Sequence, residues 1–77
     1  MKKYYDVLKE LREDNDLYQQ DIANILKIDK SYYGKYERGQ IPLPIEHLIK
    51  LCNYYKVSAD YILGISYDYK RSKKEEK

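Results

Sequence analysis

The sequence predicts a small all-α domain made of five short helices. Apolar residues recur at helical spacing in residues 4–11 and again in residues 45–55, as they do in amphipathic helices that pack on a common core. Gly39 and Gly64 each close a predicted helix, because glycine readily adopts the left-handed conformation found there. The chain has 77 residues, which suits one domain with a thin core.

The first helix is expected over residues 1–16. Tyr4, Leu8 and Leu11 form one apolar stripe along it. The acidic and polar segment 13–16 is a poor helix end, because negative charge is unfavourable near the carbonyl groups that close a helix. This segment therefore suits a loop.

The second helix is expected over residues 19–26. Its buried side consists of Ile22, Ala23, Ile25 and Leu26. The small Ala23 would let another helix cross closely, although it is equally well explained as a good helix former. Tyr18 occupies the N-cap position without being a capping residue type, so the start of this helix is weakly marked. Residues 27–29 form the turn, and Asp29 is a suitable N-cap for the helix that follows.

The third helix is expected over residues 30–38, and its two faces differ. At about 100° per residue, the basic, small and polar residues gather on one side: Ser31, Gly34, Lys35 and Arg38, with Lys30 at its edge. The other side carries Tyr32, Tyr33, Tyr36 and Glu37. A glycine inside a helix lowers helix stability by roughly 1 kcal/mol relative to alanine. Gly34 is expected to face outward, so packing within the domain does not explain it. We therefore attribute the glycine to close approach of an external backbone or base edge. The layout predicts a helix-turn-helix whose second helix lies in the DNA major groove.

The fourth helix is expected to begin with Pro44 at its first position. It carries the clearest apolar stripe of the chain, formed by Ile45, Leu48, Ile49 and Cys52 and extended by Leu51 and Tyr55. The fifth helix is expected over residues 59–63, with Ser58 as its N-cap and Gly64 at its end.

The C-terminal residues are expected to add an arm and a tail to the domain. Residues 65–69 alternate apolar and polar side chains, which permits a short extended arm. The charged residues 70–77 suit a solvated tail or, alternatively, an arm that contacts phosphates non-specifically. We therefore divide the chain into a domain over residues 1–66 and an arm and tail over residues 67–77.

Charge alone does not indicate a nucleic-acid partner. The formal net charge is +2, but residues 70–77 carry +3 and residues 1–69 carry −1. A strongly basic domain is the usual electrostatic signature of a nucleic-acid binder. The prediction of DNA binding therefore depends on where individual charges lie.

Tyrosine is unusually frequent in this chain. The sequence has eleven tyrosines and neither Phe nor Trp, so tyrosine rings must supply the aromatic part of the core, and their buried hydroxyls will need hydrogen-bond partners.

Catalysis and metal binding are not predicted. Cys52 is the only cysteine and His47 the only histidine, and their spacing places them on different faces of the fourth helix. We expect Cys52 to fill the core and His47 to lie on the surface. No disulfide can form within the chain, which fits a reducing cytoplasm. We expect no cofactor, no small-molecule ligand and no membrane span, since no apolar run approaches about 18 residues.

The chain resembles the Xre/Cro-type helix-turn-helix family, the lambda-repressor-like domain of phage and bacterial repressors. The resemblance covers residues 4–64 and rests on LRE late in the first helix, QQDIA opening the second, YYGKYERG ending the third, and VSADYILG around the fifth. Each fragment is weak alone, and their combination at this spacing is specific.

The resemblance implies a role for each matching position. It assigns base contacts to Lys30, Ser31 and Lys35. It assigns DNA phosphate contacts to Gln19, Gln20, Tyr32, Gly34, Arg38 and Gln40. It also implies a structural ion pair between Arg12 and Glu37 that holds the third helix against the first. We expect the two lysines to dominate base recognition, with a preference for guanine O6 and N7.

Two departures from the family pattern affect these assignments. Lys27 stands where many members have a turn glycine, so the left-handed conformation expected there would be strained or absent. Tyr33 and Tyr36 replace aliphatic residues on the inner face of the third helix, and their hydroxyls are expected to reach toward the rim and the phosphates.

Two function classes remain open from the sequence. The first is a repressor-type transcriptional regulator, in the cytoplasm of a bacterial or phage-infected cell at the nucleoid, that binds a palindromic operator in double-stranded DNA as a homodimer. Its dimer contact is expected to involve Tyr61, Ile65, Tyr67 and Tyr69. The alternative is the same fold used as a protein-interaction module, for example an antitoxin or an antirepressor-like adaptor, which the charge of −1 on residues 1–69 favours.

Overall fold

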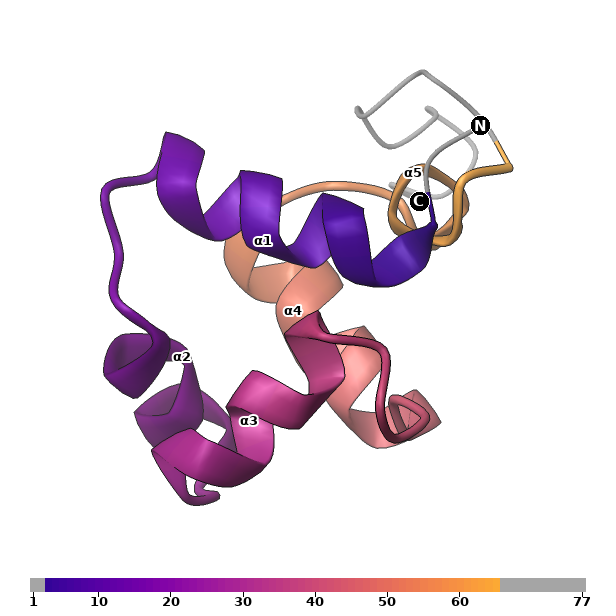
Figure 1. The fold of residues 1–77 in the computed structure, drawn as a ribbon. Helices are drawn as coiled ribbons and strands as arrows, with labels where there is room; N and C mark the ends of the chain where they lie inside the picture. The colour runs from indigo at the N-terminus through magenta and orange to yellow at the C-terminus, as the bar shows by residue number, and fades with distance from the viewer. Residues whose placement is uncertain (1–2, 66–77) are drawn as a thin grey trace.

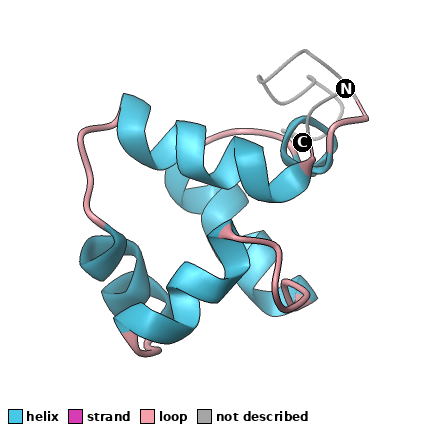
Figure 2. Ribbon diagram, viewed as in Figure 1, coloured by secondary structure: helices cyan, strands magenta, loops and turns pink. Residues whose placement is uncertain are grey.

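The computed structural model describes residues 3–65 and shows five helices in that range. They are α1 (Tyr4–Asp14), α2 (Gln19–Leu26), α3 (Lys30–Glu37), α4 (Ile45–Tyr55) and α5 (Ala59–Leu63) (Figure 1). The described residues otherwise form only turns and loops (Figure 2). The predicted all-α, five-helix fold is therefore confirmed. Across residues 3–65, every helix is too short or too polar to cross a membrane.

The helices pack around one small core. α2 packs on α3, α1 contacts both α3 and α5, and α4 contacts α5. Figure 1 shows α1 running across the other helices, with α5 beside its N-terminal end. The buried apolar residues are Val7, Leu8, Leu11, Ile22, Ala23, Leu26, Tyr33, Tyr36, Leu51, Cys52, Val57 and Ile62. Cys52 thus fills the core as predicted, and the predicted stripe of α1 omitted Val7.

Helix α1 is shorter than the predicted range. It ends at Asp14, and the Asn15 side chain donates a 2.7 Å hydrogen bond from Nδ2 to the Leu11 carbonyl. Asp16 has a φ of 57°, a conformation that cannot continue a right-handed helix. Of the polar segment 13–16, only Asn15 and Asp16 form a turn, while Glu13 and Asp14 belong to the last turn of α1. Residues 1 and 2 lie outside the described range.

Helix α4 also begins one residue later than predicted. Pro44 is the N-cap, with an extended backbone of φ −64° and ψ 151°. Its carbonyl accepts hydrogen bonds from the backbone N–H groups of His47 at 3.1 Å and Leu48 at 3.0 Å. Proline fits this place because it has no N–H group to leave unpaired. The other predicted cap, Ser58, accepts a 3.0 Å hydrogen bond from the Tyr61 N–H group, as expected.

The turn between α2 and α3 adopts the left-handed conformation without glycine. Lys27 has φ 60° and ψ 46°, and the Ile28 N–H group donates a 3.0 Å hydrogen bond to the Ala23 carbonyl. This bond belongs to the Schellman motif that closes many helices. The conformation is therefore present rather than absent, at a cost of about 1–2 kcal/mol for a side chain with a Cβ. Lys56 ends α4 in the same conformation.

Candidate nucleic-acid interface

The outer face of α3 presents the side chains expected to read DNA bases. Lys30, Ser31 and Lys35 are all exposed, as is Arg38 at the end of the helix. Tyr32 is 47% exposed, whereas Tyr33 and Tyr36 are buried. The two faces predicted from the helical spacing are therefore present, apart from Gly34. Three exposed basic groups on one short helix and its cap make this face locally positive, although the domain as a whole is not basic.

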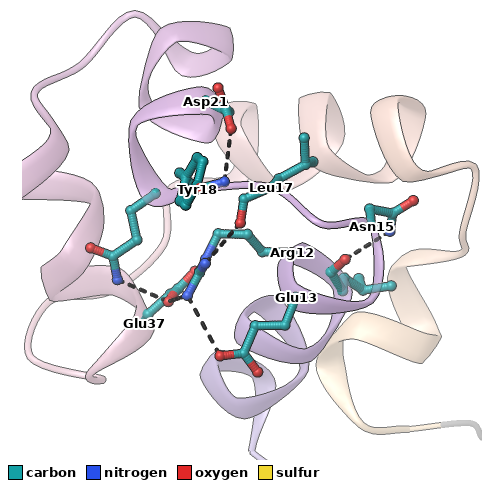
Figure 3. A network of polar contacts seen from close by, with 9 residues as sticks. Arg12, Glu13, Asn15, Leu17, Tyr18, Asp21 and Glu37 are labelled. Atoms are coloured by element: carbon teal, nitrogen blue, oxygen red, sulfur yellow. Dashed lines mark hydrogen bonds and ion pairs between the residues drawn. The ribbon is translucent and has the colours of Figure 1, made fainter.

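The predicted ion pair fixes the back of α3 to α1. Arg12 Nε donates to Glu37 Oε2 at 2.8 Å, and Arg12 Nη2 donates to Glu37 Oε1 at 3.1 Å (Figure 3). The Arg12 side chain is 12% exposed and that of Glu37 is 3% exposed. Such a two-point contact holds both groups in one orientation. It connects two residues that are 25 positions apart in the chain, one in α1 and one in α3.

Additional hydrogen bonds complete this network. Arg12 Nη1 donates to the Leu17 carbonyl at 2.9 Å, which ties the loop before α2 to the same guanidinium. Gln19 Nε2 donates to Glu37 Oε1 at 3.0 Å. The network therefore sets the position of α2 relative to α3 as well as that of α1, a role for Leu17 and Gln19 that sequence reasoning missed.

The network keeps the Glu37 carboxylate ionised. Burial by itself raises the pKa of Glu37, but hydrogen bonds from Arg12 and Gln19 and the approach of the Tyr33 hydroxyl outweigh it and lower the pKa below its ordinary value. The hydrogen bond to Glu37 likewise raises the pKa of Arg12. Both groups are charged, so the pair adds no net charge beside the exposed face of α3.

The start of α2 is better defined than the sequence indicated. The Tyr18 N–H group donates a 2.7 Å hydrogen bond to Asp21 Oδ2, seen in Figure 3. A carboxylate at the third helical position commonly binds the N-cap amide in this way. The capping signal lay in Asp21 rather than in Tyr18. The negative charge of Asp21 also stabilises α2, because it lies near the positive end of the helix dipole.

Gly34 does not face outward, which corrects the prediction. It is buried, and a Cβ built at this position would lie 3.1 Å from Arg38 Nη1 and 3.4 Å from Gln19 Oε1. The space outside the glycine is thus already occupied by two side chains of the protein. At about 100° per residue, position 34 lies only some 60° from the buried position 37, a signal that could have indicated its burial.

The inner tyrosines of α3 do not reach the rim either. The Tyr33 hydroxyl is buried without a hydrogen-bond partner among the described residues, and burial raises its pKa. The Tyr36 hydroxyl shares a 3.1 Å hydrogen bond with His47 Nδ1, and the two rings pack edge to face. His47 is therefore partly buried and joins α3 to α4, which corrects its expected place on the surface.

The predicted dimer residues fall in different environments. Ile65 is 69% exposed, whereas Tyr61 is half-buried against the core. Tyr67 and Tyr69 lie outside the described residues, as do the rest of the arm and the charged tail. Near Ile65, Leu63 is exposed and helps to line an apolar cavity of about 160 Å³ with Tyr4, Pro42, Leu43 and Leu48.

Comparison with known protein families agrees with this geometry. The sequence profile of a family described as Helix-turn-helix matches residues 8–62. The chain belongs to the Xre/Cro-like helix-turn-helix family. The family comprises DNA-binding transcriptional regulators and is not enzymatic. The match begins inside α1 and ends inside α5, so it spans the whole arrangement that positions α3.

Individual members of the helix-turn-helix family are similar to this chain. The uncharacterized HTH-type transcriptional regulator YobD of Bacillus subtilis (strain 168) is 38% identical over 65 residues, which cover 84% of this chain and 58% of YobD. The HTH-type transcriptional regulator ImmR of the same organism is 39% identical over 57 residues, which cover 74% of this chain and 45% of ImmR. The chain thus spans about half the length of the curated relatives it matches.

A solved structure shares the fold. The crystal structure of a transcriptional regulator from Listeria innocua superposes with a TM-score of 0.79 and 23% sequence identity. The superposition covers 96% of this chain and 69% of that protein. At this identity, the likeness supports the helix-turn-helix fold alone.

Proposed function

We propose that this chain is a sequence-specific, repressor-type transcriptional regulator that places α3 in the major groove of DNA. The observation that carries the proposal is the pairing of an exposed basic face with a rigidly held back. Lys30, Ser31 and Lys35 are exposed on one side of α3. On the other side, Glu37 is bound by Arg12 at 2.8 Å. A recognition helix needs both features, because base contacts require a fixed helix orientation.

The exposed side chains divide into base and phosphate contacts. Among the proposed base contacts, Lys30 and Lys35 are the long donors and suit guanine O6 and N7, while Ser31 has a short hydroxyl that either donates or accepts. The phosphate contacts are assigned to Gln19, Gln20, Tyr32, Arg38 and Gln40. Gly34 is not retained among them, because other side chains of the protein cover it.

The regulator acts as a homodimer on a palindromic operator. A single helix makes too few contacts for useful specificity, whereas two copies about 34 Å apart read successive turns of the groove. The exposed side chains of Leu63 and Ile65 support a dimer contact at the end of α5. Tyr61 and the arm residues Tyr67 and Tyr69 complete the candidate surface.

A protein-binding function of the same fold is the second candidate. Ile45 and Ile49 of α4 are 71% and 54% exposed, and residues 1–69 carry a net charge of −1. Both observations favour a surface that meets another protein rather than DNA. In that case an antitoxin-like or antirepressor-like partner would occupy α4, and the basic face of α3 would be incidental.

The salt dependence of DNA binding tests the proposed function. We expect the full chain to bind duplex DNA with an affinity that falls by about 10³-fold or more between roughly 50 and 200 mM salt, as for 6–10 phosphate contacts. Selection of bound sequences from a random duplex pool should yield a palindrome with half-sites about one helical turn apart. Absence of DNA binding at the lower salt concentration would favour the protein-interaction function.

Replacing Lys35 with alanine should weaken binding to the selected operator by roughly 1–3 kcal/mol and relax the preference at one base position. The physical reason is the loss of a donor to a base edge, which changes affinity in a sequence-dependent way. A gel-shift series against single-base operator variants measures both effects. Lys9→Ala removes an exposed charge from α1 and serves as the matched control. Unchanged affinity and base preference in Lys35→Ala would remove Lys35 from the interface.

A further inference from the structure

The side chain of Arg38 rests on Gly34 rather than extending freely from the end of α3. A Cβ at Gly34 would lie 3.1 Å from Arg38 Nη1 and 3.8 Å from Arg38 Cζ. These atoms belong to the guanidinium, so the charged end of Arg38 lies directly over the glycine backbone. A residue with a Cβ would crowd the guanidinium and make it shift by a few tenths of an ångström, because a contact of 3.1 Å is tighter than carbon and nitrogen ordinarily adopt.

Gln40 binds the same guanidinium, and Gln19 lies on the other side of Gly34. Arg38 Nε donates a 3.2 Å hydrogen bond to Gln40 Oε1. On the other side, Gln19 Oε1 lies 3.4 Å from the position that a Gly34 Cβ would take. Gln19 is itself held, because its Nε2 donates to Glu37, so its oxygen stays beside Gly34. We call Gly34, Gln19 and Gln40 the Arg38 seat.

Among residues 3–65, no acidic side chain pairs with the Arg38 guanidinium. Within residues 3–65, Arg38 forms no ion pair, whereas the other arginine, Arg12, is paired with Glu37. Arg38 is exposed, and it has guanidinium N–H groups beyond the one that binds Gln40. A guanidinium that Gln40 already orients and that keeps further donors is a good phosphate ligand, because it loses less side-chain freedom on binding than an unbound one.

We propose that Gly34 is a positioning residue, which places Arg38 to bind a DNA backbone phosphate beside the N-terminus of α2. The inference rests on the proposed function and deepens it. It replaces the explanation that Gly34 admits the DNA backbone itself, since that space is filled by Arg38 and Gln19.

A double-mutant cycle with Gly34→Ala and Arg38→Ala tests this assignment. The probe is a mixed-sequence duplex of about 25 base pairs at roughly 50 mM salt, where phosphate contacts dominate affinity. Arg38→Ala should weaken binding roughly tenfold, as expected for a lost charge-assisted hydrogen bond, and lower the salt slope by about one. Gly34→Ala should produce a smaller loss in the same direction in both quantities, and it should have no further effect when Arg38 is already alanine.

Direct approach of DNA to Gly34 predicts a different result. Gly34→Ala would then weaken binding equally in the presence and absence of the Arg38 side chain, and that outcome would overturn the proposal. Unchanged affinity and salt slope in Gly34→Ala would overturn it as well. Misfolding is separable, because alanine favours a helix over glycine and should leave the melting temperature unchanged or raise it by up to about 4–8 °C. Lys9→Ala again controls for the loss of a remote charge.

An NMR measurement on the free protein tests the position of the Arg38 side chain independently of DNA binding. The Arg38 Nε–H signal in the NMR spectrum of the free protein should move toward that of a solvated arginine in Gly34→Ala and in Gln40→Ala. An unchanged signal in Gly34→Ala would show that the glycine does not position Arg38. Failure of the unaltered chain to bind the duplex would instead reject the proposed DNA-binding function, and with it the phosphate role of Arg38, even if the signal moves.

Discussion

Replacing Arg12 with alanine should lower the free energy of unfolding by about 3–5 kcal/mol, the usual cost of leaving one partner of a buried ion pair without the other. The Glu37 side chain is only 3% exposed, so its carboxylate depends on protein donors rather than on bulk water for its hydrogen bonds. Arg12→Ala also removes the hydrogen bond to the Leu17 carbonyl. Denaturant unfolding of the two proteins measures the difference, and an unaltered denaturant slope would show that the denatured state is unchanged.

The pH dependence of this loss identifies its cause. In the unaltered protein the pKa of Glu37 is lowered, so its stabilising contribution is present above the ordinary glutamate pKa of about 4.3 and is lost as the pH falls through the lower folded value. In Arg12→Ala, burial without the guanidinium raises the pKa of Glu37. The penalty should therefore shrink as the pH falls and Glu37 becomes neutral.

The matched control removes both charges together. Arg12→Met combined with Glu37→Leu replaces the pair by apolar side chains and should be more stable than Arg12→Ala, because no uncompensated charge remains buried. A loss in Arg12→Ala that is below 1 kcal/mol and independent of pH would show that the pair is not a stabilising contact. In the double variant α3 should also be held less firmly against α1, so we expect the variant to bind DNA more weakly than the unaltered protein.

Replacing Gly39 with alanine is expected to lower the free energy of unfolding by about 2–4 kcal/mol. Two effects combine there. Gly39 has a φ of 70°, a conformation that disfavours any residue with a Cβ. In addition, an added Cβ would lie 2.6 Å from Cε2 of the Tyr5 ring, which is an overlap rather than a contact. Thermal or denaturant unfolding measures the effect.

The steric part of this effect can be tested separately. In a Tyr5→Ala background the overlap is absent, so Gly39→Ala should then cost only the backbone strain of about 1–2 kcal/mol. The difference between the two backgrounds measures the contact with Tyr5. Equal costs in both backgrounds would mean that the ring moves aside freely, and that glycine is needed for its backbone conformation alone.

The sequence was sufficient to locate the helices, because each depends on nearby residues. Apolar spacing placed α4, a capping serine and a closing glycine placed α5, and the bounds of α2 were predicted without error. The errors at α1, α3 and α4 were confined to their ends, where fraying and capping decide single residues. The Arg12–Glu37 pair was predicted only through the family resemblance, since periodicity does not relate residues 25 positions apart.

The tertiary structure alone decided what surrounds α3. Gly34 lies between two side chains, one from α2 and one from the end of its own helix, so its burial depends on how the helices cross. The Tyr36–His47 hydrogen bond likewise requires α4 to lie beside α3. Local sequence therefore determined that α3 has a basic face and an aromatic face. The packing of α1, α2 and α4 determined which of its residues remain available to DNA, because burial depends on contacts between segments far apart in the chain.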